Sequence, residues 1–302
     1  DFGTRCFSSF HRVRIANDED GWDEFAEVQS VPYSSILPPY AIIIRFVNRV
    51  LYMPNFWDVA QRFLTANQIE VRGISRIDLC ADFNQFATMD PRALIEGFAA
   101  KKYRHIGRGV GSLAFNHGVI RGDYGVNYTG LTFGTHSSDA HVYLYNKSFE
   151  LLTQGDKPWI RERWSRCGLN VREVWRLEVS IKSGGLKFKD KKSGQIVEIN
   201  ESYIYDSLAL DKVYHTFVTK LFSFVNNRKG IKNITREPRI KLFDDRPTFD
   251  RGSIANTSPG NRMERILIRQ LWQMSDVYRG ARIFGAQDKA RAFATDIAAA
   301  TG

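Results

Sequence analysis

Three stretches of the sequence alternate between apolar and polar residues, and their polar positions carry tyrosines, carboxylates and cations. Successive side chains of a β-strand point to opposite faces, so each stretch would bury one face and expose chemistry on the other. The polar positions are Tyr143, Tyr145 and Lys147 in 140–150, Asp78 and Asp82 in 76–83, and Arg176 and Glu178 in 175–181. For any single stretch the alternative is a sheet with a solvated outer face. The three together favour a shared site.

These residue types suit phosphoryl transfer to a tyrosine. A tyrosine hydroxyl is a poor nucleophile near neutral pH because its reference pKa is about 10. A lysine can stabilise the phenolate, and a divalent cation held by carboxylates can polarise the phosphate under attack. Lys147 shares the predicted face with Tyr145. Hard oxygen ligands of the kind that suits Mg²⁺ or Mn²⁺ are present at Asp78, Asp82 and Glu178.

Strand geometry limits how these residues can act together. The Cα atoms of Asp78 and Asp82 would be about 13 Å apart in a regular strand, so both can bind one ion only if the strand bulges or one acts through an intermediary. One of them could instead orient an arginine. Tyr143 and Tyr145 would be about 6.6 Å apart, and either could reach the same phosphate. Lys147 is closer in sequence to Tyr145, which favours Tyr145 as the nucleophile.

The charge balance favours a polyanionic partner, with nucleic acid first. Lysine and arginine number 43 against 33 aspartates and glutamates, a net charge of +10. In the expected helix 156–168, Trp159, Arg163 and Arg166 share one stripe, a candidate stacking and phosphate surface. The alternative is a tryptophan at the edge of the core with solvated arginines. The candidate DNA-binding residues are Trp159, Arg161, Arg163, Arg166 and Arg176, with Lys187, Lys189 and Lys191 in an expected basic turn at 186–194.

Cysteines and hydropathy favour a cytoplasmic protein. The three cysteines are far apart and form no CxxC, so neither a disulfide framework nor a zinc knuckle is indicated. No apolar run approaches a membrane span, and the first ten residues lack the charged and apolar regions of a signal peptide. The first residue is Asp1 rather than methionine, which leaves open whether a segment precedes it.

The chain as a whole predicts an α+β fold, in which a central and largely antiparallel sheet has helices on one face and is followed by a helical C-terminal region. Strands are expected at 5–16 and 41–52, flanking that sheet, and meandering strands at 108–134. Helices are expected at 55–67, 90–104, 156–168 and 204–226. The predicted domains are a catalytic unit at 1–229, a connector at 230–260 and the helical region at 261–302.

Three motifs carry a resemblance to a known family: RIDLCADF at 76–83, YTGLTFGTHSSDAHVYLYNKSFE at 128–150, and VWRLEVSIK at 174–182. In order and spacing they resemble the replication initiation factors of rolling-circle plasmids and phages, which include relaxase-like proteins of conjugative elements. The resemblance covers about residues 73–182 and hardly touches the C-terminal third.

The resemblance implies a metal-dependent nickase and ligase that keeps the 5′ end of origin DNA as a phosphotyrosine and frees a 3′ hydroxyl for a polymerase. By motif, the nucleophile falls on Tyr145 and the acidic positions on Asp78, Asp82 and Glu178. The implied setting is the cytoplasm of a bacterial host, and the implied partner is single-stranded or cruciform origin DNA. A host helicase, a polymerase and a second copy of the chain are further partners that the resemblance leaves open.

The six histidines form no His-hydrophobic-His pair of the kind that binds metal in many rolling-circle nucleases.

Two other functions remain open at the level of the sequence. A non-catalytic single-strand-binding protein would use Tyr143, Tyr145 and Trp159 for stacking, but it would not need carboxylates that repel phosphate. A tyrosine recombinase would need a late nucleophile, and no HxxR precedes Tyr278.

Overall fold

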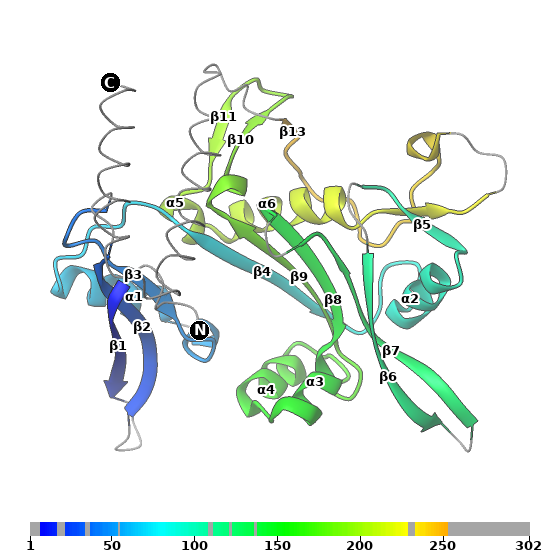
Figure 1. Ribbon diagram of the computed structural model, residues 1–302, viewed down its shortest axis with the longest axis horizontal. Coiled ribbons are helices and arrows are strands. Elements are labelled where there is room, and N and C mark those ends of the chain that lie inside the picture. Colours follow the sequence, from blue (N-terminus) through cyan, green and yellow to red (C-terminus); the bar gives the residue numbers. More distant parts are fainter. Residues whose placement is uncertain are drawn as a thin grey trace, which may run out of the picture. The chain divides into compact units, whose positions relative to one another are not determined.

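The fold is built on a five-stranded antiparallel sheet, as the sequence predicts (Figure 1). The computed structural model describes residues 7–16, 22–33, 37–53, 55–107, 111–120, 123–135, 138–228 and 233–252. In spatial order the strands of this sheet are β4 (Arg76–Phe83), β9 (Trp175–Lys182), β8 (Ala140–Asn146), β7 (Asp123–Phe133) and β6 (Gly111–Ile120). Among the described residues β4 and β6 are the two edges.

Alternation along the strands separates a core face from a polar face. Val142 and Leu144 of β8 and Leu177 and Val179 of β9 are almost completely buried on the core face. Burying such a side chain contributes about 1.5–3 kcal/mol, so this face drives the packing. The helices α2 (Pro91–Ala99) and α6 (Ser207–Leu221) add their apolar residues to the same core, and α6 packs against β4, β8 and β9.

Short side chains cap the helices that leave the sheet. The Asp206 carboxylate accepts hydrogen bonds from two backbone N–H groups in the first turn of α6, and Asp90 does the same for α2. Asn146 caps α3 (Lys147–Gln154) by accepting from the Phe149 N–H at 2.8 Å. The expectation that Lys147 continues the strand is therefore wrong, because the cap turns the chain into a helix at Lys147.

The N-terminal residues form a separate three-stranded sheet. It contains β1 (Phe7–Ala16), β2 (Trp22–Pro32) and β3 (Ile43–Phe46), and β2 lies in the middle. With α1 (Phe56–Ala66) these strands enclose an aromatic core of their own, around Phe25 and Phe56. The expected strand at 41–52 is thus much shorter, and η1 (Val50–Tyr52) replaces its second half. β1 and β3 both pair with β2, so the strands expected at 5–16 and 41–52 do not flank the central sheet.

The remaining elements correct two further expectations. The basic segment 186–194 contains strand β10 (Lys187–Asp190) rather than only a turn, and the expected helix 204–226 is interrupted at Tyr205–Asp206 and ends at Leu221. The elements not yet named are β5 (Tyr103–His105), β11 (Ile196–Glu198), β12 (Phe224–Asn226), β13 (Arg251–Gly252), α4 (Pro158–Arg166), α5 (Glu201–Ile204), η2 (Ser183–Gly185) and η3 (Ile234–Arg236).

One compact unit extends to Gly252, and it includes β13 from the predicted connector, which pairs with β10. The predicted helical region 261–302 lies outside the described residues. Within the part of the chain that the structure describes, none of the helices has the length and apolar character needed to cross a membrane.

Candidate active site on the polar face of the central sheet

Antiparallel pairing aligns the polar residues of β4, β9 and β8 in rows across the sheet. Glu178 lies opposite Cys80 on one side and Tyr143 on the other. In the next row, Arg176 lies between Asp82 and Tyr145. Directly opposite residues of an antiparallel pair share a face, with Cβ atoms about 4.5–5.5 Å apart. The tyrosines, carboxylates and arginine expected from three separate stretches therefore meet on one surface.

Tyr145 and Glu178 form the central contact of this surface. The phenol of Tyr145 donates a hydrogen bond to Oε2 of Glu178, with 3.2 Å between the oxygens, and both side chains are half-buried. Burial raises the pKa of Tyr145 well above its usual range, and the negative charge of Glu178 raises it further. The hydroxyl is therefore protonated as it stands, and its proton points at a carboxylate that can accept it.

The surroundings of Glu178 make its carboxylate a stronger base than an exposed one. Burial raises its pKa above the ordinary value, and the charge of Asp78 adds to this effect. Arg176, the hydrogen bond from Tyr145 and Lys147 act in the opposite direction but do not cancel it. A buried carboxylate with a raised pKa beside a hydroxyl is the arrangement expected of a general base.

Lys147 reaches the same tyrosine from the start of α3. Its ammonium nitrogen lies 5.5 Å from the centre of the Tyr145 ring and forms an ion pair with Glu150. The side chain is only 5% exposed. Burial lowers the pKa of Lys147, and the ion pair with Glu150 partly offsets that change. A cation in this position can stabilise a phenolate on Tyr145, although it approaches from a helix and not along the strand as expected.

Tyr143 has different neighbours. Its ring packs edge-on against the buried ring of His141, with 4.7 Å between the ring centres. Burial raises the pKa of Tyr143, and the nearby charge of Arg76 lowers it. Tyr145 receives the Lys147 cation over its ring and donates to Glu178, whereas Tyr143 packs against His141 and lies near the charge of Arg76.

Arg176 and Asp82 form a buried ion pair. The Arg176 guanidinium donates to both oxygens of Asp82, at 2.6 and 2.7 Å, and its side chain is 3% exposed. It also donates to the Tyr52 hydroxyl at 2.8 Å, and the Trp164 indole donates to Asp82 at 2.7 Å. Burial lowers the pKa of Arg176, but Asp82 outweighs it and keeps the group charged. Arg176 does not lie on the exposed surface, where its expected contact with DNA would occur.

The three expected metal ligands do not form a single site. Asp82 is held by Arg176 and Trp164, whereas Asp78 accepts from Arg76 at 2.8 Å. In the described parts of the chain, no three His, Cys, Asp or Glu side chains converge closely enough to hold a metal ion. Magnesium commonly uses one or two carboxylates together with substrate phosphate and water. Asp78 and Glu178, which are diagonal neighbours across β4 and β9, fit that mode of binding.

The candidate DNA-binding residues lie on two separate elements. Trp159, Arg161, Arg163 and Arg166 belong to α4, and the Asp82 contact of Trp164 brings this helix to the polar face. Lys187 and Lys189 lie on β10, which belongs to another sheet, and Lys191 directly follows that strand. Several of these cations form exposed ion pairs, among them Arg161 with Asp156 and Lys187 with Glu198. The Arg49 guanidinium lies over the Trp159 ring, 5.6 Å from its centre.

Similarity to known proteins is found among solved structures. The chain is similar to the rolling circle replication initiator protein from Geobacillus stearothermophilus, with a TM-score of 0.41 and 12% sequence identity over 76% of this chain and 78% of that chain. No protein-family model matches the sequence, and no curated protein matches it. The family resemblance therefore depends on the three motifs alone.

Two residues of the site were not expected to belong to it. Tyr52 is 124 residues away from Arg176 in sequence, and it belongs to η1 beside the N-terminal sheet. Trp164 belongs to α4 and is almost fully buried. Its indole N–H needs an acceptor when buried, and that requirement was the signal that could have indicated a contact with a carboxylate.

Proposed function

We propose that this protein is a DNA nickase and strand-joining enzyme of the rolling-circle initiator type, which acts through a covalent 5′-phosphotyrosine at Tyr145. The observation that carries the proposal is the hydrogen bond from Tyr145 to Glu178 on a half-buried polar surface, with the Lys147 ammonium over the Tyr145 ring. A nucleophile, its base and a cation for the developing charge are thus within reach of one another. The net charge of +10 supports a polyanionic substrate.

In the proposed cleavage step the Tyr145 oxygen forms a bond to phosphorus, and the bond from phosphorus to the 3′ oxygen of the preceding nucleotide breaks. The phenol proton passes to Glu178, and the departing 3′ oxygen takes a proton from water. Lys147 offsets the negative charge that develops on the phenol oxygen. Joining is the reverse reaction, in which a 3′ hydroxyl attacks the phosphotyrosine and Tyr145 recovers its proton.

Mg²⁺ or Mn²⁺ is part of the proposal, with Asp78 and Glu178 as its protein ligands. Glu178 would use one carboxylate oxygen for the cation and keep Oε2, which accepts from Tyr145, for the proton. When bound there with a substrate phosphate, the cation would polarise that phosphate and reduce the repulsion between it and the carboxylates. Asp82 is assigned a different task. Through Arg176 it fixes the row of polar side chains next to Tyr145.

The proposed substrate is single-stranded origin DNA lying along the polar face. Trp159, Arg163 and Arg166 on α4 would bind its backbone and bases, because this helix adjoins Asp82 through Trp164. The 3′ hydroxyl released by cleavage would serve a polymerase as a primer.

The direct test is to incubate the protein with a library of single-stranded oligonucleotides and manganese, digest it, and search by mass spectrometry for peptides that carry a nucleotide. The expected product is an adduct on the peptide that contains Tyr145. The Tyr145→Phe variant is the control. Binding of the library without any adduct would refute the enzymatic proposal and leave the non-catalytic single-strand-binding function.

A further inference from the structure

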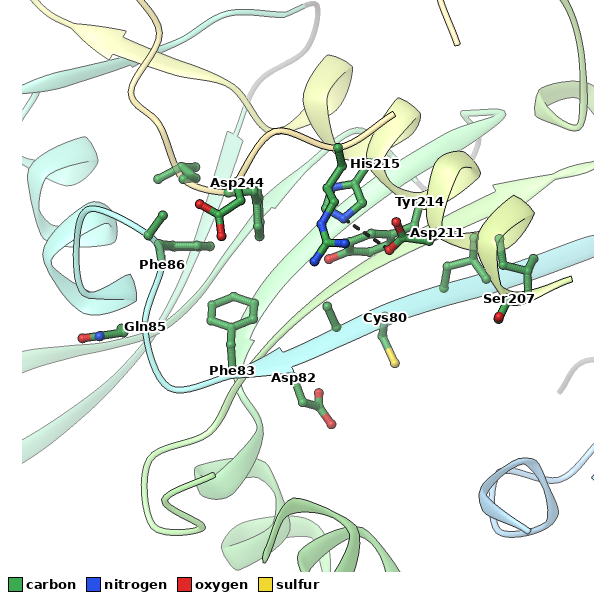
Figure 2. Close-up of a pocket in the computed structure, with 17 residues that line it drawn as sticks. Cys80, Asp82, Phe83, Gln85, Phe86, Ser207, Asp211, Tyr214, His215 and Asp244 are labelled. Carbon is green, nitrogen blue, oxygen red and sulfur yellow. Dashed lines mark ion pairs between the residues drawn. The ribbon is translucent and has the colours of Figure 1, made fainter. Parts of the chain in front are cut away.

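A cavity of about 730 Å³ lies against β4, α6 and residues 242–246 (Figure 2). Its size is within the range of about 300–1,000 Å³ that is typical of small-ligand sites. Figure 2 shows that Phe83 lies on the same side of β4 as α6, whereas Asp82 points to the opposite side. Both residues line the cavity, so it reaches the outer edge of β4. Strand β8, which carries Tyr145, is the second strand from β4, so the two strands are about 10 Å apart across the sheet.

The walls of the cavity are rich in aromatic rings. The Phe83 and Phe86 ring centres are 4.8 Å apart, and Phe243 lies 5.4 Å from Phe86 and 5.8 Å from the His215 ring. Hydrogen bonds from the β4–α2 loop hold the segment that carries Phe243, with the Ala87 N–H bonded to the Leu242 carbonyl at 2.9 Å. The cavity is thus preformed and suits a flat apolar surface.

Its charged groups disfavour a phosphate and favour a ligand with amino groups. The charged lining residues are three carboxylates, Asp82, Asp211 and Asp244, and one cation, Arg246. Asp82 is already paired with Arg176, which leaves Asp211 and Asp244 for a ligand. Oδ1 of Asp211 lies 3.5 Å from Nε2 of His215. Burial lowers the pKa of His215, so the imidazole adds no positive charge near neutral pH. Asp244 is exposed and lies 4.0 Å from Lys241. Carboxylates accept hydrogen bonds from amino groups but repel phosphate.

The strand itself supplies further hydrogen-bonding groups. β4 is an edge strand among the described residues, so part of its backbone N–H and C=O groups faces away from β9. Residues 79–83 of this edge line the cavity. The free backbone groups of this strand can form hydrogen bonds with the polar rim of a planar ring that packs against the aromatic side chains.

We propose that this cavity binds one unpaired nucleobase of the substrate strand, from a nucleotide next to the cut, and prefers bases with an exocyclic amino group. The inference deepens the proposed function and depends on it for the identity of the strand. The base lies against this cluster of aromatic rings, its amino group donates to Asp244 or Asp211, and its phosphates stay outside the cavity. Adenine, cytosine and guanine have such an amino group, and thymine lacks one.

Binding of free deoxynucleosides to the full chain tests the cavity without any cleavage. In saturation-transfer NMR, deoxyadenosine, deoxycytidine and deoxyguanosine should bind at millimolar concentration, with thymidine weaker by ~5- to 150-fold. Asp244→Asn should weaken binding of the three amino-bearing nucleosides and reduce that preference. Asp245→Asn, the matched control at an exposed neighbour that does not line the cavity, should have no effect. Equal binding of all four nucleosides, or binding of none, overturns the inference.

A second experiment separates this inference from the proposed function. A cleavable oligonucleotide is synthesised with an abasic site at each position in turn, and the yield of the Tyr145 adduct is measured. One position near the cut should lose yield at least fivefold, and Phe243→Ala should remove the difference between intact and abasic strands. A uniform yield at every position refutes the base pocket while cleavage stands. If deoxynucleosides bind as expected but no adduct forms, the pocket stands and the proposed function fails.

Discussion

The hydroxyl of Tyr145 donates to the carboxylate of Glu178 across neighbouring strands, with 3.2 Å between the two oxygens. Burial raises the pKa of both groups, so the proton resides on the phenol and the carboxylate has a raised affinity for it. Lys147 lies on the same tyrosine, 5.5 Å from its ring centre. This relationship makes Tyr145 and Glu178 one unit of proton transfer and is the basis of the first two predictions.

Tyr145→Phe should abolish both nicking and the covalent adduct, because the attacking oxygen is removed. Tyr143→Phe should retain both at a reduced rate, since its hydroxyl has different neighbours. Denaturing gels of labelled oligonucleotide would measure nicking, and mass spectrometry would locate the adduct. An adduct on Tyr143, or on a tyrosine outside 140–150, would show that the nucleophile is misassigned.

Glu178→Gln should lose cleavage while binding of single-stranded DNA stays unchanged or becomes stronger, because the base is lost together with a charge that repels phosphate. Asp78→Ala should have the same two effects if it is a metal ligand. Cleavage rate and fluorescence-anisotropy binding are measured on the same preparations. Full cleavage by both variants, with manganese still required, would contradict the assigned ligands.

Thermal stability should report the raised pKa of Glu178. A carboxyl whose pKa is higher in the folded than in the unfolded protein stabilises the fold at low pH, and that stability is lost as pH rises through the folded pKa. Glutamine keeps an acceptor for Tyr145 and cannot ionise. We therefore expect the difference in melting temperature, Glu178→Gln minus the parent protein, to increase as the pH rises from below 4.5, the ordinary pKa of glutamate. A chelator is present in all samples.

The control for this measurement is Glu162→Gln, at an exposed carboxylate, which should show little trend with pH. If the melting-temperature difference between Glu178→Gln and the parent falls as the pH rises, the surroundings stabilise the ionised carboxylate. That result would contradict the assignment of Glu178 as a base with a raised pKa.

Asp82→Asn should be strongly destabilising, because it leaves the buried Arg176 without its counter-charge. Breaking such a pair from one side costs about 3–5 kcal/mol. Asp156→Asn breaks the more exposed pair with Arg161 and should cost no more than ~1 kcal/mol. Urea denaturation measures both free energies of unfolding. Equal effects of the two substitutions would rule out a structural role for the buried pair.

Binding of single-stranded DNA should weaken steeply with salt, since each neutralised phosphate contributes about 0.7 to the slope of log K against log salt. If Arg163 contacts phosphate, Arg163→Gln should reduce that slope by about 0.7. Arg12→Gln, at an exposed arginine of β1 that is paired with Glu24, serves as the control. A slope near zero in the parent protein would argue against the electrostatic surface on α4.

The polar face could be predicted from the sequence because strand alternation is a local property. In 76–83, 140–146 and 175–181, each apolar position packs into the core and each polar position has the opposite orientation, as a period of two requires. The start of α2 likewise follows from a local signal, an aspartate before an apolar periodic stretch. Lys147 was misjudged although its signal was also local, since Asn146 can end a strand and begin a helix.

Strand order and register were decided only by the tertiary structure. Nothing in the spacing of Asp78 and Asp82 reveals that Arg176 lies opposite the second of them, and this pairing separates Asp82 from the expected metal ligands. Tyr52 and Trp164 complete the Arg176–Asp82 pair from distant parts of the chain. The sequence by itself determined which residues face away from the core, because side-chain direction depends on local backbone geometry. Which of them meet depended on long-range packing, since buried polar groups must find partners wherever the folded chain brings them.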